Sequence, residues 1–173
     1  NRSRVVAGYC WEWPTAGKSD PNHHDIVIPE HGFTRSWNLG STATWAIDEG
    51  SIDQIGCIHT SQGLEFDYVG VIIGDDLRSE GDVVITDPTR RAKSDASLKG
   101  LKSMAKSDPE RASQAADELI RNTYRVLMTR GMKGCYVFCT DAALAQHLRD
   151  QLPTVTYTHA SSIAPQAAEA TQE

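Results

Sequence analysis

The stretch from residue 55 to residue 74, IGCIHTSQGLEFDYVGVIIG, places a polar cluster between two apolar runs. The runs Ile55–His59 and Tyr68–Gly74 are short, rich in β-branched or aromatic residues and bounded by turn formers, which predicts two strands. A third such run lies at Cys135–Cys139, and weaker strand candidates lie at Arg4–Ala7 and Asp82–Thr86. The main runs are continuous rather than alternating, so we expect central strands that are covered on both faces.

Helical patterns alternate with these runs. One helix is predicted from Pro109 to about Arg130, with Ser107 or Asp108 as its N-cap and Gly131 at its end. A second is predicted from Thr140 or Asp141, and Pro153 ends it. The alternation of strands and helices indicates an α/β fold with a mostly parallel sheet and flanking helices.

Length and composition indicate one globular domain. The chain has 173 residues, 17 Lys and Arg against 23 Asp and Glu, and a formal net charge of −6. We expect the domain to cover residues 1–158. The polar segment 159–173 is predicted to be a disordered tail or linker. Because the chain begins at Asn1 rather than Met, we expect it to be a piece of a longer protein.

No apolar stretch reaches the ~18 residues of a transmembrane helix, and no signal peptide is evident. We therefore expect no membrane association, a cytoplasmic location and reduced, buried cysteines. The spacing of the four cysteines fits no structural zinc site. The run His23-His24-Asp25 could in principle bind a metal, but the turn-forming residues 19–22 before it favour a solvated loop, so no metal ligand is predicted.

The charge is unevenly distributed along the chain. Residues 86–111 carry seven basic and four acidic side chains, whereas residues 1–85 carry five basic and thirteen acidic ones. We interpret residues 87–108 or so as a basic, mobile insertion. The alternative is a loop that contacts phosphates.

Familiar catalytic motifs are missing from the sequence. It contains no GxxxxGK[ST] phosphate loop, and Gly17-Lys18-Ser19 lacks the upstream strand and glycine that such a loop needs. It also contains no GxSxG nucleophile elbow and no evident Cys–His pair, which argues against an unrelated α/β hydrolase.

Two polar segments remain as candidates for function. Residues 57–67 crowd polar side chains at the carboxyl end of a predicted strand, where open α/β sheets place ligands. Gly63 allows a positive φ or a close backbone approach there. In the second segment, residues 122–131, Arg130 is either a planar donor toward phosphate oxygens or a cation that complements the helix C-terminus.

Together these segments match known motifs. HTSQGLEFD with YVGVIIG resembles motif V of superfamily-one helicases, and YRVLMTRG with KGCYVFC resembles motif VI. The flanking GYCWEW and SWN make the sequence more narrowly similar to the Schlafen-type DNA/RNA helicase domain family, over about residues 1–150. The resemblance implies a RecA-like fold, as the second of two motor domains and without a phosphate loop of its own.

The same resemblance implies roles for particular residues. Arg130 would be the arginine finger, Gln62 and Gly63 would lie near the γ-phosphate, and Glu65 would bind the ribose. Arg125 and Thr129 would assist at the nucleotide, and His59 and Thr60 would face a single nucleic-acid strand. Two positions depart from the common motif V pattern: Gln62 replaces a frequent Lys, and Cys57 replaces a frequent Thr.

The resemblance also implies cofactors and partners. ATP and Mg²⁺ would be held by an upstream RecA-like domain of the same chain, and the substrate would be single-stranded DNA or RNA. We therefore predict half of an ATP-dependent helicase or translocase that is inactive in isolation. The alternative is a nucleic-acid-binding or regulatory module that does not hydrolyse ATP. The tryptophans at 11, 13, 37 and 45 are either a base-stacking platform or core residues.

Overall fold

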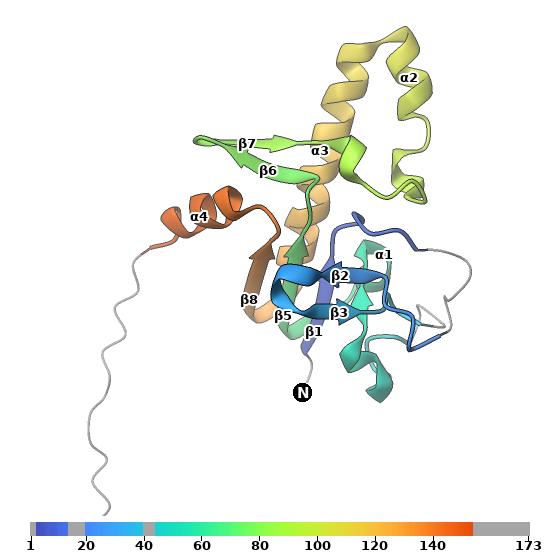
Figure 1. The fold of residues 1–173 in the computed structure, drawn as a ribbon, viewed down its shortest axis with the longest axis vertical. Coiled ribbons are helices and arrows are strands. Elements are labelled where there is room, and N and C mark those ends of the chain that lie inside the picture. Colours follow the sequence, from blue (N-terminus) through green and yellow to red (C-terminus); the bar gives the residue numbers. More distant parts are fainter. Residues whose placement is uncertain (1–2, 14–19, 40–43, 154–173) are drawn as a thin grey trace, which may run out of the picture.

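The computed structural model describes residues 3–13, 20–39 and 44–153. Four parallel strands form its central sheet in the order β4-β1-β5-β8 (Figure 1). Their bounds are Ile55–Gly56 for β4, Ser3–Ala7 for β1, Phe66–Ile73 for β5 and Gly131–Cys139 for β8. The predicted α/β fold with a parallel sheet and flanking helices is therefore confirmed, and this architecture is consistent with a RecA-like domain.

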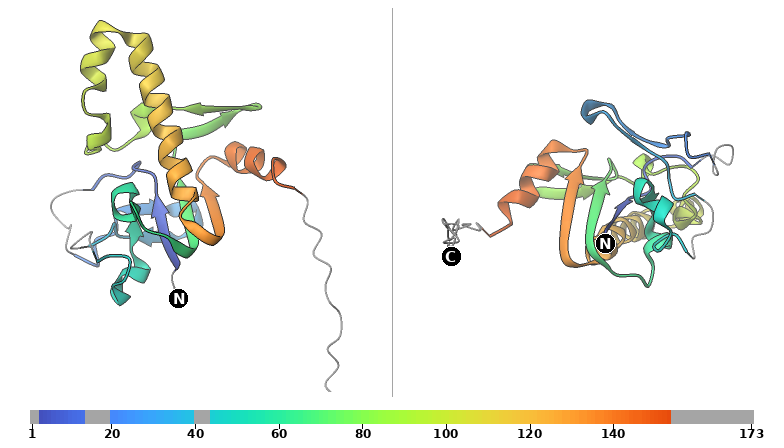
Figure 2. Two further views of the ribbon diagram at one scale, coloured as in Figure 1. Left: turned by 180° about the vertical axis from the view of Figure 1, so that it is seen from behind. Right: turned by 90° about the horizontal axis from the view of Figure 1, so that it is seen from below.

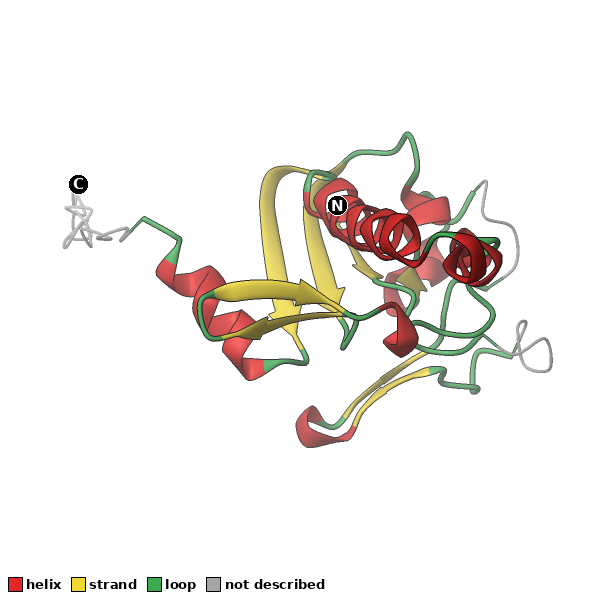
Figure 3. Ribbon diagram, turned by 90° about the horizontal axis from the view of Figure 1, so that it is seen from above, coloured by secondary structure: helices red, strands yellow, loops and turns green. Residues whose placement is uncertain are grey.

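One long helix, α3 (Pro109–Met128), covers one face of the sheet (Figure 3). Asp108 caps it as predicted, because its carboxylate accepts a hydrogen bond from the Arg111 amide at 3.0 Å. The helix buries Ile120, Tyr124 and Leu127 against the buried side chains of β5. Each such apolar side chain contributes about 1.5–3 kcal/mol on burial.

The opposite face is covered by an antiparallel hairpin of β2 (Ile26–Ile28) and β3 (Phe33–Arg35), joined by the 3₁₀ turn η1 (Pro29–His31). The hydrophobic cluster between the hairpin and the sheet includes Trp37, which is fully buried and stacks on Tyr9 with ring centroids 5.4 Å apart. Trp45 is buried in the hydrophobic cluster on the α3 side of the sheet. Both side chains are thus core residues rather than exposed stacking platforms. The hairpin leaves part of β8 uncovered, so that Tyr136 is 70% exposed.

Between β5 and α3 the chain forms several further elements. These are the antiparallel pair β6 (Leu77–Glu80) and β7 (Val83–Thr86), the turns η3 (Pro88–Arg90) and η4 (Ala96–Leu98), and the helix α2 (Leu101–Ser107). Figure 2 shows α2 beside the first half of α3, where the two project from the sheet. The segment predicted as a basic insertion, about 87–108, therefore contains two 3₁₀ turns and a helix, and its mobility stays a prediction.

This segment carries a buried ion-pair network. The guanidinium of Arg91 lies between the carboxylates of Asp76 and Asp95, and all three side chains are at most 2% exposed. Asp76 lies in the turn just after β5, beyond Gly74 and Asp75, so the network fastens the segment to the sheet. The net positive charge of the segment gave no indication that one of its arginines, Arg91, is buried.

Several element boundaries differ from the prediction. The run Ile55–His59 is a strand only at Ile55–Gly56, because a short helix, α1 (Ile58–Ser61), begins at Ile58. Gly131 does not cap α3 but begins β8, and a Cβ atom there would collide with the Gly134 carbonyl. The remaining elements are η2 (Glu49–Asp53) and α4 (Ala142–Asp150).

The four cysteines differ in their exposure. All four cysteines are free thiols; Cys57 and Cys139 are buried, Cys10 is half-buried, and Cys135 is exposed on β8, contrary to expectation. Gly17-Lys18-Ser19 and the proposed tail lie outside the described residues. Among the residues described, no helix is long and apolar enough to cross a membrane.

Candidate functional site

The polar turn before β5 is built by α1 and Gly63. The helix α1 ends at Ser61, and Gly63 takes a positive φ of 73° that reverses the chain. The side chain of Leu64 packs against the core, whereas Gln62, Gly63 and Glu65 remain exposed. The turn therefore presents an amide, a bare backbone and a carboxylate to solvent.

Arg130 follows the end of α3 and points back over it. Its Nε donates to the Val126 carbonyl at 3.0 Å, and its Nη1 donates to the Leu64 carbonyl at 3.4 Å. Its Nη2 lies 3.4 Å from the Thr129 hydroxyl. All three partners are neutral oxygens, and Arg130 has no ion-pair partner in the described part of the chain. Its charge is thus oriented but not neutralised, and two of its five donors stay available.

The structure brings these two segments together. The Phe66 amide donates to the Arg130 carbonyl at 2.8 Å, and Phe66 pairs with Gly131 at the start of both strands. The guanidinium therefore lies against the turn that holds Gln62, Gly63 and Glu65. Arg130 also contacts a last-turn carbonyl of α3, so it complements the helix C-terminus as well.

The polar turn and Arg130 lie at the opposite edge of the sheet from the one predicted. The polar turn was expected at the carboxyl end of a strand, but residues 62–65 and Arg130 lie at the amino ends of β5 and β8. The reason is that β4 stops at Gly56, after which α1 and the turn carry the chain back along the sheet before β5 begins.

The other predicted residues take different positions. Thr129 is exposed, and its hydroxyl donates to the Val126 carbonyl at 3.0 Å. Arg125 is exposed on α3 and donates to Asn122 Oδ1 at 3.3 Å. Arg125 is not among the side-chain hydrogen-bond partners of Arg130.

His59 and Thr60 are adjacent in sequence but not alike in exposure. His59 is exposed on α1. Thr60 is 2% exposed, and its hydroxyl accepts from the Cys57 amide at 2.7 Å and donates to the Cys57 carbonyl at 2.9 Å. The Thr60 side chain therefore holds α1 in place and does not reach the surface.

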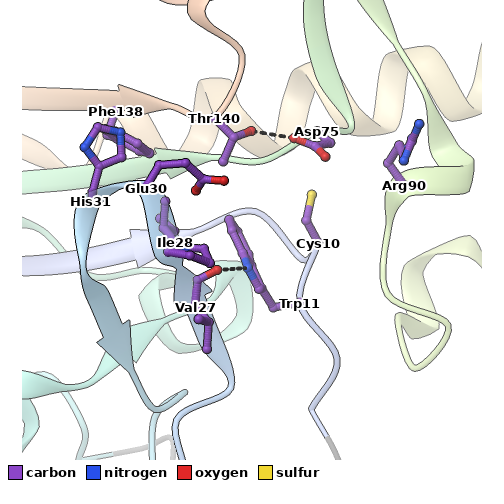
Figure 4. A pocket seen from close by; sticks show the side chains of 11 residues that line it. Cys10, Trp11, Val27, Ile28, Glu30, His31, Asp75, Arg90, Phe138 and Thr140 are labelled. Atoms are coloured by element: carbon purple, nitrogen blue, oxygen red, sulfur yellow. Dashed lines mark hydrogen bonds between the residues drawn. The ribbon is translucent and has the colours of Figure 1, made fainter.

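A cavity that the sequence did not indicate lies at the opposite, carboxyl edge of the sheet (Figure 4). It has a volume of about 430 Å³ and is lined by residues that follow β1, β5 and β8 and by parts of η1 and η3. Asp75 accepts a hydrogen bond from Thr140 Oγ1 at 2.7 Å at its rim. Its polar lining includes Glu30, His31, Asp75 and Arg90, which come from distant segments, so no local motif could reveal it.

Comparisons with known proteins agree with the motifs. A family model described as "Schlafen group 3, DNA/RNA helicase domain" matches residues 1–141. The uncharacterized protein YPL245W of Saccharomyces cerevisiae is 31% identical over 105 residues, which are 60% of this chain and 22% of that protein. The match thus spans about a fifth of the length of that relative. No solved structure matches the chain.

Proposed function

Because the chain belongs to the Schlafen group 3 DNA/RNA helicase domain family, we propose that it is the second RecA-like half of an ATP-dependent DNA or RNA helicase or translocase. One observation carries this proposal: Arg130, oriented only by neutral oxygens, lies against the exposed turn of Gln62, Gly63 and Glu65. A cation held in this way fits a polyphosphate, because no carboxylate in the described part of the chain competes for it.

Each residue of the site has a proposed task. Arg130 neutralises charge that develops on the transferred phosphoryl group. The exposed Gln62 amide and Gly63 backbone sense the terminal phosphate, and the Glu65 carboxylate accepts a hydrogen bond from a ribose hydroxyl. Thr129 and Arg125 extend the polar surface, and Arg125 takes part only if the partner domain reaches its side of α3.

The remaining components come from elsewhere in the whole protein. The sequence contains no phosphate loop, so we assign that loop and the carboxylates that hold Mg²⁺ to a partner RecA-like domain upstream. ATP supplies the phosphoanhydride bond whose hydrolysis drives movement. Closing and opening of the cleft between the domains then couples this site to a single strand that His59 contacts.

Turnover by the whole protein tests the proposal. We expect Arg130→Ala to lower the kcat of nucleic-acid-stimulated ATP hydrolysis by about 10³-fold or more, with a change of only a few fold in the affinity for ATP. The matched control is Arg149→Ala, which removes an exposed arginine from α4 and should leave kcat unchanged.

Two results would count against this function. Equal turnover of Arg130→Ala and the parent protein would remove the arginine-finger assignment. Nucleic-acid binding without any ATP hydrolysis by the parent would instead favour a binding or regulatory module that retains the helicase fold.

A further inference from the structure

The helices α2 and α3 form an arm that extends beyond the carboxyl edge of the sheet (Figures 1 and 2). None of the seven residues of α2 is buried, and its main packing partner is α3. Leu101 and Met104 are its half-buried positions. The rest of α2 therefore faces solvent, at the end of α3 opposite Arg130.

The base of this arm is fixed to the sheet. Arg91 Nη1 lies 3.3 Å from Asp76 Oδ2, and Arg91 also binds Asp95, whose other oxygen accepts from the Ser97 amide at 2.9 Å. The Ala92 amide donates to the Tyr9 carbonyl at 2.8 Å. The segment that leads into α2 is thus fixed next to the sheet.

Cations without carboxylate partners lie on α2 and just before it, at Lys99, which we count as part of the arm. Lys99, Lys102 and Lys106 are exposed, and none has an ion-pair partner among the described residues. The nearest acidic groups in the sequence are mostly engaged, since Asp95 binds Arg91 and Asp108 caps α3. Glu110 is the remaining acidic residue of this region.

The stability of α2 explains only Lys106, which lies in the last turn, where a cation complements the helix dipole. Lys102 and Lys106 stand four residues apart on one face, where like charges repel. Lys102 also lies in the first turn, where a cation opposes the helix dipole. Elsewhere in the described residues, Arg121 and Lys133 are exposed and have carboxylate partners, whereas Arg125 and Arg149 stand singly without one.

We propose that the arm, through Lys99, Lys102 and Lys106, binds the phosphate backbone of single-stranded nucleic acid. This inference rests on the proposed function, and it assigns the strand a second contact beyond His59. Three flexible ammonium groups suit a phosphate backbone because they carry charge without base-specific geometry. The arm therefore supplies affinity and position but no sequence preference.

Binding without nucleotide tests the arm separately from ATP turnover. The whole protein is titrated against labelled poly-uridine RNA and poly-thymidine DNA, and anisotropy is followed between about 50 and 200 mM salt. For the triple variant Lys99→Gln, Lys102→Gln, Lys106→Gln, we expect affinity at low salt to fall about tenfold or more. We expect the slope of log K against log salt to become shallower by about 2, or ~0.7 for each lost contact.

The control is a triple variant with the same change in net charge: Arg35→Gln, Lys133→Gln, Arg149→Gln. Arg35 and Lys133 lie in solvent-exposed ion pairs away from the arm, and the salt slope should stay that of the parent. An equal loss in both triple variants, or an unchanged slope in the arm variant, would overturn the inference while leaving the Arg130 result intact. Failure of the parent to bind either strand would overturn the inference and also remove nucleic acid from the proposed function.

Discussion

Asp76 is fully buried in the turn after β5, where its carboxylate joins several segments of the chain. It accepts hydrogen bonds from Arg91 and from the hydroxyl of Tyr124, which also accepts from the Gly74 amide at 3.1 Å. Burial raises the pKa of Asp76 above its ordinary value of 3.8, because removal from water penalises the charged carboxylate more than these partners favour it.

This raised pKa predicts a pH dependence of stability. Between pH 3.8 and the raised pKa, the folded state binds more protons at Asp76 than the unfolded state does, so its contribution to stability falls as pH rises. Asp76→Asn lacks this titration. We therefore expect the free energy of unfolding of the parent, relative to the variant, to decrease with pH in that window by up to about 1.4 kcal/mol per pH unit.

Urea unfolding from pH 4 upward measures this difference. Asp82→Asn, which removes an exposed carboxylate from the turn between β6 and β7, corrects for the change in net charge. A difference between parent and Asp76→Asn that is constant or increases with pH would show that burial does not dominate at this carboxyl group.

At the scale of elements, most of the strong local signals in the sequence were reliable, although the run Ile55–His59 is a strand only over its first two residues. Asp108 and Pro109 marked the start of α3, and the apolar runs marked β5 and β8. The three-residue strands β2 and β3 carry no comparable signal, since their pairing depends on packing over the sheet. The burial of Thr60 was also not predictable from the sequence, because it depends on hydrogen bonds between its hydroxyl and the Cys57 backbone.

The N-cap of α3 permits a direct measurement at this scale. Asp108→Ala removes the acceptor for the Arg111 amide at the junction of α2 and α3, so we expect a loss of about 1 kcal/mol in the free energy of unfolding. Asp108→Asn should restore most of the loss because it keeps an acceptor oxygen. The control Asp82→Ala should stay within about 0.5 kcal/mol of the parent, and a loss as large as that of Asp108→Ala would contradict the capping role.

At the scale of the whole molecule, α3 joins the two ends where we place function. Its twenty residues span about 30 Å, from the arm beyond the carboxyl edge to Arg130 at the amino edge. Only its second half is packed on the sheet, through Ile120, Tyr124 and Leu127. The motifs in the sequence identified the Arg130 end, and the basic composition of residues 86–111 suggested a contact with phosphates. That this segment folds into a helix beside α3 became evident only from the three-dimensional arrangement.

This division of packing predicts unequal local stability. Because α2 buries no side chain and seven residues make a marginal helix, its amides should exchange through local opening. Amides of β5, which lies between β1 and β8 and buries Val69, Val71 and Ile73, should exchange only on global unfolding. In native-state hydrogen exchange followed by mass spectrometry, we expect the opening free energy of α2 to be lower than that of β5 by about 2 kcal/mol or more and to be insensitive to low urea.

The second half of α3 serves as the internal reference and should behave like β5. If α2 instead shared the free energy and urea dependence of β5, the arm would belong to the same cooperative unit as the sheet.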